Sequence, residues 1–400
     1  MVLPPGHPGN LPRVNPARKF RAACYTIEGL NSFATVIYFN YLYFLFRNRF
    51  GFDNKQNLAL AALIGLIYTF ASWQAGKFAQ RYGNFTALKL GFGVMSAGLV
   101  LGSQIGSVTG QIVVACVINV GMCFIWPVLE ALVSEGTGAA RAVGIYNITW
   151  AVNNALAYFV GGAIIEHFGY QSIFYVPLTF ILAQLGMVFW IEKIHLNHVA
   201  PAAGNGLPPE PHRPSPEKAR SFQRMAWLAN PFAYIAINTL LAVMPGIAAQ
   251  FHLSTSLAGF VCSLWCFARV LAFIGLWQWT RWHYRFRWMA TAFALLILSF
   301  VAILSTPSLM LLLVAQVFFG LAIGLVYYSS LFYSMDASDT KSEHGGIHEA
   351  AIGIGNFVGP AVGAASLQFF PQYTHNGVMA VSVLLLGGFG GVVAIWKKGL

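Results

Sequence analysis

Charged residues are scarce in this sequence, and their scarcity sets its class. Only 9% of the 400 residues are Asp, Glu, Lys or Arg, compared with about 25% in a typical soluble domain. Hydrophobic residues make up 57% of the chain, and the mean hydropathy is +0.64. This balance excludes an ordinary soluble globular domain and indicates an integral membrane protein.

Cysteine is also rare, with five residues in the chain. None of them has the clustered spacing with histidine that a zinc site needs. We therefore expect the cysteines to be small apolar core residues, and we expect no metal site and no cofactor. They are Cys24, Cys116, Cys123, Cys262 and Cys266.

The sequence consists largely of long stretches of apolar residues. Many are close to or above the ~20 residues that cross a ~30 Å hydrocarbon layer, and they lack the alternation of barrel strands. We predict an all-α polytopic membrane protein with twelve transmembrane helices in two pseudo-symmetric six-helix bundles. The predicted spans are 24–46, 57–76, 87–106, 110–133, 143–165, 171–191, 226–249, 255–279, 287–305, 308–334, 347–369 and 376–396.

A Pro-rich stretch, PAAGNGLPPEPHRPSPEK at 201–218, divides these spans six against six. Its composition is typical of a semi-extended linker. The predicted organisation is a cytoplasmic N-terminal segment at 1–23, a bundle at 24–191, a cytoplasmic linker at 192–225, a second bundle at 226–396 and a cytoplasmic tail at 397–400.

The formal net charge of +11 is distributed on one side of the predicted spans. With the N-terminus in the cytoplasm, nineteen of the 23 Lys and Arg residues fall on that side, and only Arg47, Arg49 and Lys55 fall on the other. By the positive-inside rule this bias predicts that both termini are cytoplasmic. Since topology accounts for the charge, we expect no nucleic-acid partner and a protein of a bacterial inner membrane.

Two short motifs carry a family resemblance. The loop after the second span has Gly76, Arg81 and Gly83, and the eleventh span has Gly355, Gly359, Pro360 and Gly363 in a Gly-x-x-x-Gly-Pro-x-x-Gly pattern. A shift of about 200 residues also aligns QRYGN at 80–84 with TRWHY at 280–284, as expected of an internal repeat. At these residues the chain resembles the major facilitator superfamily.

The resemblance implies a functional monomer in which one bundle rocks against the other, around a cavity lined by the first, fourth, seventh and tenth helices. The chain departs from the family pattern at Gln80, where the family has Asp, and in the fifth span, which lacks the antiporter motif; this departure favours uptake. Our candidate gating residues are Gly76, Gln80, Arg81, Gly83, Arg141, His348, Glu349, Gly355, Gly359 and Pro360.

Arg269 lies near the middle of the eighth predicted span, where a charge facing lipid would be costly. It is the only Asp, Glu, Lys or Arg between Arg224 and Arg281, so any partner must come from elsewhere in the chain. Two interpretations stay open, an anion anchor that can exchange partners and a fixed structural ion pair. Glu28 and Glu130 are the candidate partners.

Glu28 and Glu130 are acids within spans and away from the predicted ends. A carboxyl group in such a place can bind and release a proton as a cavity changes its access, so we predict that both couple transport to protons. For Glu130, an ion pair with Arg81 or Arg141 at a gate is an equal alternative.

Polar and aromatic side chains within the spans suit a small polar organic solute, such as a sugar derivative, a nucleoside or a carboxylate. The Asn residues carry most weight because an unpaired amide in a membrane is expensive. The candidate substrate-binding residues are Asn31, Tyr38, Trp126, Asn147, Trp150, Asn154, Tyr234, Asn238, Trp265, Arg269, Tyr327 and Ser330.

The sequence thus predicts a secondary active transporter of a small polar organic solute that uses protons as coupling ions, and not an enzyme. An efflux antiporter of amphipathic compounds, a passive facilitator and a lipid transporter remain alternatives. A different class, a membrane-embedded enzyme, would use His344, His348 and Glu349, whose spacing also suits a proton relay, a gate or an exposed helix start.

Overall fold

The structure is a computed structural model that describes residues 16–134, 139–196, 215–337, 341–372 and 376–399. Every regular element among them is a helix. The helices are α1 (Pro16–Phe50), α2 (Asn54–Tyr82), α3 (Asn84–Gln104), α4 (Val108–Cys123), α5 (Trp126–Ser134), α6 (Ala139–Phe168), α7 (Ser172–Leu196), α8 (Pro216–Gln250), α9 (Thr255–Gln278), α10 (Phe286–Ser305), α11 (Leu309–Ala337), α12 (Lys341–Phe369) and α13 (Asn376–Lys398).

Each predicted span coincides with helix to within two residues at its ends, apart from a break inside the fourth, and most helices run past the apolar stretch. The clearest extension is α8, which begins at Pro216 inside the predicted linker. The Ser215 hydroxyl caps this helix by accepting a hydrogen bond from the Lys218 amide, and Glu217 lies in the first turn. These are ordinary helix-start residues, but their polarity keeps them out of an apolar window.

The fourth predicted span is interrupted between α4 and α5. Pro127 has no N–H to donate to the preceding turn, and the chain tightens at Phe124 and Ile125, whose amides donate to carbonyls three residues back. The break turns the Trp126 side chain toward α1, where it contacts Glu28.

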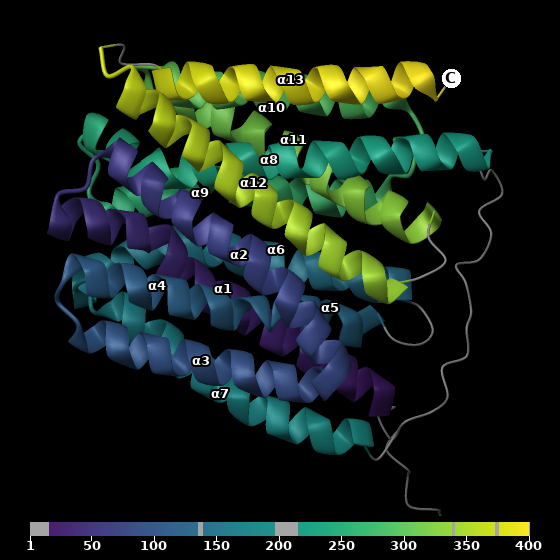
Figure 1. Ribbon diagram of the computed structural model, residues 1–400, viewed down its shortest axis with the longest axis horizontal. Helices are drawn as coiled ribbons and strands as arrows, with labels where there is room; N and C mark the ends of the chain where they lie inside the picture. Colours follow the sequence, from purple (N-terminus) through teal and green to yellow (C-terminus); the bar gives the residue numbers. More distant parts are fainter. Residues whose placement is uncertain (1–15, 135–138, 197–214, 338–340, 373–375, 400) are drawn as a thin grey trace, which may run out of the picture.

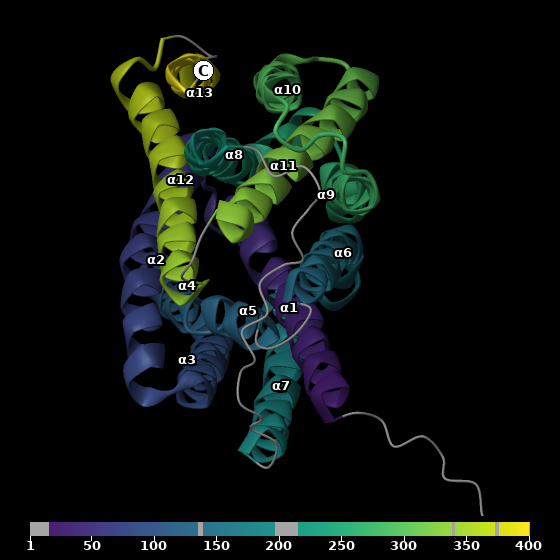
Figure 2. The same cartoon turned by 90° about the vertical axis from the view of Figure 1, so that its right-hand side faces the viewer.

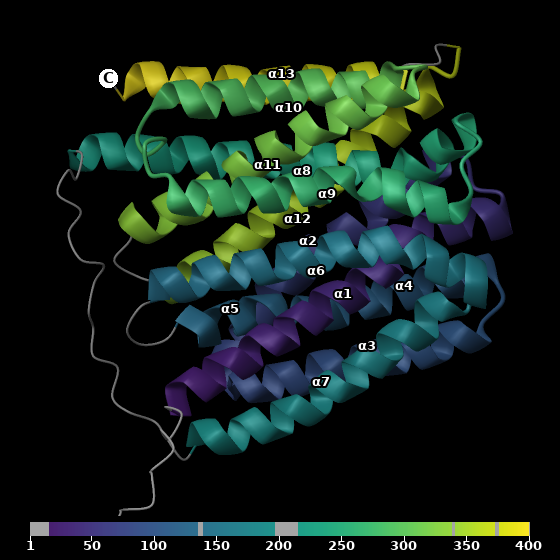
Figure 3. The same cartoon turned by 180° about the vertical axis from the view of Figure 1, so that it is seen from behind.

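The helices form two groups that lie side by side (Figure 2). The N-terminal group contains α1–α7 and the C-terminal group contains α8–α13. Across the interface α2 packs along α12, and α6 packs along α9. The beginning of α1 and the end of α13 lie at the same end of the molecule, called here the terminal end (Figures 1 and 3).

Eleven helical segments within the described ranges are long and apolar enough to cross a membrane, with α4 and α5 forming one of them. The segment below this threshold is α1, which carries the polar Asn31 and Asn40 and several tyrosines. Both asparagines are nevertheless buried, because α1 lies in the interior of the bundle. An interior helix can be less apolar than one that faces lipid.

Hydrogen bonds join the two groups at two depths. At the end opposite the terminal end, the Lys55 ammonium donates to the Gln368 side chain at 3.0 Å, and the Ser256 amide donates to Glu166 at 2.9 Å. Near mid-depth, the Tyr68 hydroxyl donates to the Glu349 carboxyl group. The groups are therefore held together from mid-depth to the end away from the termini.

Candidate functional site

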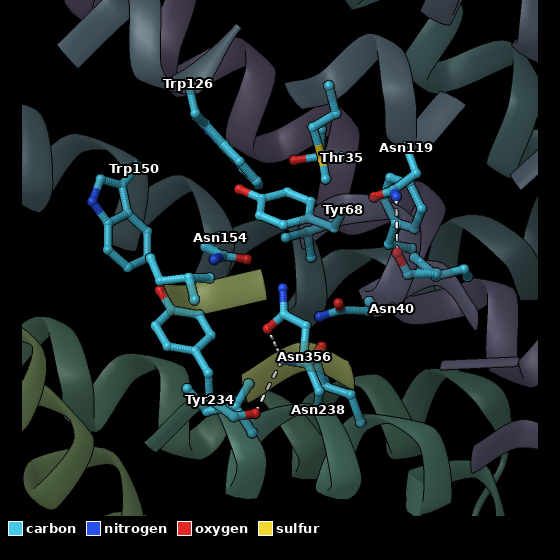
Figure 4. Close-up of a pocket in the computed structure, with 18 of the residues that line it drawn as sticks. Thr35, Asn40, Tyr68, Asn119, Trp126, Trp150, Asn154, Tyr234, Asn238 and Asn356 are labelled. Carbon is cyan, nitrogen blue, oxygen red and sulfur yellow. Dashed lines mark hydrogen bonds between the residues drawn. The ribbon is translucent and has the colours of Figure 1, made fainter. Parts of the chain in front are cut away.

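A cavity of about 200 Å³ lies between the two groups. Its walls come from α1, α2, α4, α5 and α6 on one side and from α8, α9, α11 and α12 on the other. Figure 4 shows amide and aromatic side chains of both groups facing one another across it. All four helices expected from the family resemblance contribute to the lining, and so do the second, fifth, eighth and eleventh spans.

Eight of the twelve predicted substrate-binding residues line this cavity. They are Trp126, Trp150, Asn154, Tyr234, Asn238, Trp265, Arg269 and Tyr327. The predicted coupling residues Glu28 and Glu130 line it as well, together with Glu349. The structure thus brings together most of the polar residues that the sequence singled out.

The remaining four predicted substrate-binding residues are buried outside the cavity lining. Asn31 and Tyr38 lie on α1, and the Tyr38 ring packs edge-on against Phe174 with centroids 5.9 Å apart. Asn147 accepts a hydrogen bond of 2.8 Å from the Trp150 indole and so orients a lining residue. Ser330 is fully buried on α11.

The orientation of α1 explains the misplacement of Asn31 and Tyr38. Its lining face contains Glu28, Thr35 and Asn40. At ~100° of rotation per residue, Asn31 and Tyr38 lie about 40–80° beyond Glu28 and Thr35, on the side away from Asn40. They pack within the N-terminal group, so a polar stripe on a helix does not by itself identify the face that meets a cavity.

The Arg269 side chain contacts aromatic rings and forms no ion pair among the described residues. Its guanidinium carbon lies 4.6 Å from the centroid of the Trp150 ring and 5.0 Å from that of Trp265, so the cation lies against two indole rings. The side chain is only 4% exposed, and Nε and Nη2 have no hydrogen-bond partner among the described residues. Within the same part of the chain, it forms no ion pair with Glu28 or Glu130.

Glu28 is held by three donors from three helices. Its Oε1 accepts from the Ser32 hydroxyl at 2.8 Å and from the Trp126 indole at 3.1 Å, and its Oε2 accepts from the Tyr146 hydroxyl at 2.9 Å. This network joins α1 to the start of α5 and to α6. Because the carboxyl group is fully buried, these donors are what makes its position inside the membrane tolerable.

Glu349 and Glu130 form a second acidic position. Glu349 is buried on α12 and accepts its hydrogen bond from Tyr68 of the opposite group. Glu130 lies half-buried at the cavity on α5, and the two carboxyl groups interact electrostatically. Glu349, which the sequence suggested as a gating residue or as part of a proton relay or an enzyme site, therefore belongs to the cavity.

Several further polar lining residues escaped the sequence prediction, among them Asn40, Tyr68 and Asn356. Asn356 accepts a hydrogen bond of 2.6 Å from the Asn238 side chain, which Figure 4 shows on the C-terminal side of the cavity. Position offered a hint for Asn356, which lies within the glycine pattern; nothing in the sequence marked Asn40 or Tyr68.

Residues 30–360 match the model of the Major Facilitator Superfamily. The chain belongs to this superfamily. A search of curated proteins gave no match.

Solved transporter structures with the same fold confirm the architecture of a superfamily member. A bacterial homologue of the human lysosomal transporter Spinster, inward-facing and unoccupied, is 14% identical with a TM-score of 0.63, covering 97% of this chain and 96% of its own. The human organic anion transporter MFSD10 is 13% identical with a TM-score of 0.68, covering 95% and 99%. A POT family transporter in complex with 5-aminolevulinic acid is 11% identical with a TM-score of 0.73, covering 95% and 96%.

The superfamily loop lies at the junction of α2 and α3. Gln80 and Arg81 are exposed there, and Gly83 has a φ of 92° with a ψ of 151°, a conformation that only glycine adopts readily. Arg141 is exposed at the start of α6. Among the described residues neither arginine forms an ion pair with Glu28 or Glu130, so the alternative gate bridge for Glu130 is not formed in this state.

The superfamily pattern in α12 lies against α8. A methyl group on Gly359 would lie 2.5 Å from the Ile235 carbonyl oxygen, and one on Gly355 would collide with the Pro231 carbonyl. Pro360 continues the same helix. By contrast, a methyl group on Gly76 of α2 would meet nothing within 4 Å. The side chains of His344 and His348 lie outside the described residues.

Proposed function

We propose that this chain is a secondary active transporter that moves a small polar organic solute across the membrane by alternating access. The observation that carries the proposal is the cavity between the two helix groups, to which both groups contribute polar and charged lining residues. A solute held there contacts both groups at once, so their relative movement can open it to either side. We propose the predicted bundles, 24–191 and 226–396, as the moving units of a functional monomer.

The described state suits access from the terminal end. The hydrogen bonds of Lys55 and Glu166 join the groups at the opposite end, and the positive-inside bias of the sequence supports a cytoplasmic terminal end. On this basis we assign the state as inward-facing, in a bacterial inner membrane with both termini cytoplasmic. Uptake is the direction that we propose.

Proton coupling is supported by the acids of the cavity. Glu28 and Glu130 face a space within the membrane, where a bare carboxylate is costly. Binding of a proton removes that charge. When the proton leaves, hydrogen-bond donors such as those around Glu28 can stabilise the carboxylate again. A carboxyl group whose surroundings differ between the two states therefore links proton release to movement of the groups.

Uptake into proteoliposomes tests this function. Vesicles with an imposed pH gradient, acidic outside, are given a mixture of amino acids, sugars, nucleosides and organic acids, and mass spectrometry measures their contents. We expect at least one solute to accumulate above its external concentration, and a protonophore to abolish the accumulation. Equilibration without accumulation would instead show a passive facilitator.

The coupling residues are tested by Glu28→Gln and Glu130→Gln in the same vesicles. The matched control is Glu192→Gln, because the Glu192 carboxylate pairs with Lys89 at 3.0 Å between α7 and α3, away from the cavity. We expect accumulation to be lost in at least one cavity variant and kept in the control. Accumulation that persists in both cavity variants would remove these carboxyl groups from the coupling mechanism.

A further inference from the structure

The cavity has a positive end that nothing in the described part of the chain neutralises. Arg269 is buried against Trp150 and Trp265, and its unpartnered nitrogen atoms are Nε and Nη2. These two atoms are the pair that grips a carboxylate from the side, with two parallel hydrogen bonds. The two indole faces fix the plane of the guanidinium but offer it no acceptor, so this edge lacks an anion.

The cavity also has a negative end, made by Glu130 of α5 and Glu349 of α12. The two carboxyl groups lie close enough to interact electrostatically, and Tyr68 supplies a hydrogen bond to one of them. Two like charges in a poorly solvated space repel each other, and a bound cation relieves the repulsion. An ammonium group, with three N–H donors, can serve both carboxylates at once.

The two ends are separate, with tyrosines between them. The hydroxyl groups of Tyr234 and Tyr327 interact electrostatically with Arg269 and also with Glu130 and Glu349. The charges that act on the two acids within the described residues do not include Arg269. The cavity therefore does not neutralise itself, and its charges are arranged as a dipole.

We propose that the transported solute is a small zwitterion, whose carboxylate binds Arg269 and whose ammonium group binds Glu130 and Glu349. This proposal rests on the proposed transport function and names the chemical class of its solute. A simple anion would satisfy Arg269 but leave the pair of acids unrelieved. A simple cation would do the reverse, so a molecule with both charges at opposite ends matches both ends of the cavity when the acids are ionised.

The test uses the purified full-length protein and sets of probes matched in size. γ-Aminobutyrate is compared with butyrate, n-butylamine and butyramide, and ε-aminocaproate with caproate, n-hexylamine and caproamide; binding is measured by ligand-induced thermal stabilisation. Glycine and β-alanine extend the series to shorter separations of the two charges. We expect a zwitterion of one length to bind best, with its one-charge analogues weaker by roughly 30-fold or more, because each leaves a buried charge unpaired.

Variants assign the two ends. Arg269→Gln should abolish the preference for the zwitterion over the amine, whereas Glu349→Gln should abolish the preference over the carboxylate. Glu192→Gln, outside the cavity, should keep both preferences. The comparison within the unaltered protein stands even if a variant does not fold.

Two results would overturn the proposal. One is equal binding of the carboxylate and the zwitterion by the unaltered protein. The other is the absence of binding by every amino acid of the series to a protein that accumulates some other solute in proteoliposomes. In the second case the transport function stands and only the solute class fails, whereas vesicles that accumulate nothing would count against the transport function itself.

Discussion

The contact between α8 and α12 predicts that Gly359→Ala destabilises the protein. An added methyl group would lie 2.5 Å from the Ile235 carbonyl oxygen, 2.7 Å from the Thr239 hydroxyl and 2.9 Å from the Ile235 Cα atom. Since favourable contacts lie at about 3.5–4.0 Å, the two helices would have to separate by roughly 1 Å. Overpacking of this kind costs about 1–3 kcal/mol.

Gly390→Ala in α13 is the matched control, because a methyl group there meets nothing within 4 Å. Replacing glycine by alanine inside a helix gains about 0.5–1 kcal/mol when no clash opposes it. Both substitutions gain this helix propensity, so the two variants should differ by the overpacking cost alone, about 1–3 kcal/mol in the free energy of unfolding, measured by reversible denaturation in mixed micelles. Equal stability of the two would refute the close packing of α8 and α12.

Three further predictions concern the cavity and the α2–α3 loop. Tyr68→Phe removes the hydrogen bond to Glu349, worth about 1 kcal/mol, and should shift the equilibrium between conformations about fivefold. Spin-label distances between Phe168→Cys and Phe370→Cys at the end opposite the terminal end would report this shift, and an unchanged distance distribution would contradict it. Tyr146→Phe leaves Glu28 Oε2 without its 2.9 Å donor and should cost about 0.6–1.7 kcal/mol of unfolding free energy, whereas Tyr175→Phe on the exposed face of α7 should cost nothing measurable. Gly83→Ala should destabilise by about 1–3 kcal/mol, because its φ of 92° suits only glycine; the helical Gly76→Ala, with open space around it, should be neutral or slightly stabilising, and the reverse order in a denaturation experiment would contradict the loop geometry.

The spans could be predicted because crossing a membrane demands a long apolar run, and such runs are visible without a structure. The ends of the helices could not, since the residues that start α8, such as Ser215 and Glu217, are polar. The break between α4 and α5 was also missed, although Pro127 marks it. The residues at the break, Phe124 and Ile125, are apolar, so the hydropathy pattern continues through the point where the regular backbone hydrogen bonds are interrupted.

The sequence predicted the lining of the cavity best at side chains that are energetically costly to place within a membrane. Glu28, Glu130 and Arg269 are ionisable residues within the membrane-spanning helices, and all three line the cavity. Asn31 shows the limit of that reasoning, because polarity does not state which neighbour a helix face meets. The contact of Tyr68 with Glu349 depends on how α2 packs along α12. The sequence of either helix alone does not contain this tertiary contact.

Alternating access of the cavity is the central claim, and the accessibility of one engineered cysteine tests it most directly. In protein with its five native cysteines replaced, Asn154→Cys places a thiol at the half-buried cavity wall, and Leu271→Cys on an exposed apolar face of α9 is the control. A membrane-impermeant thiol reagent is added to oriented vesicles from one side or the other. We expect the thiol at position 154 to react from both sides, and a transported solute to slow both reactions. Reaction from a single side under all conditions would contradict alternating access.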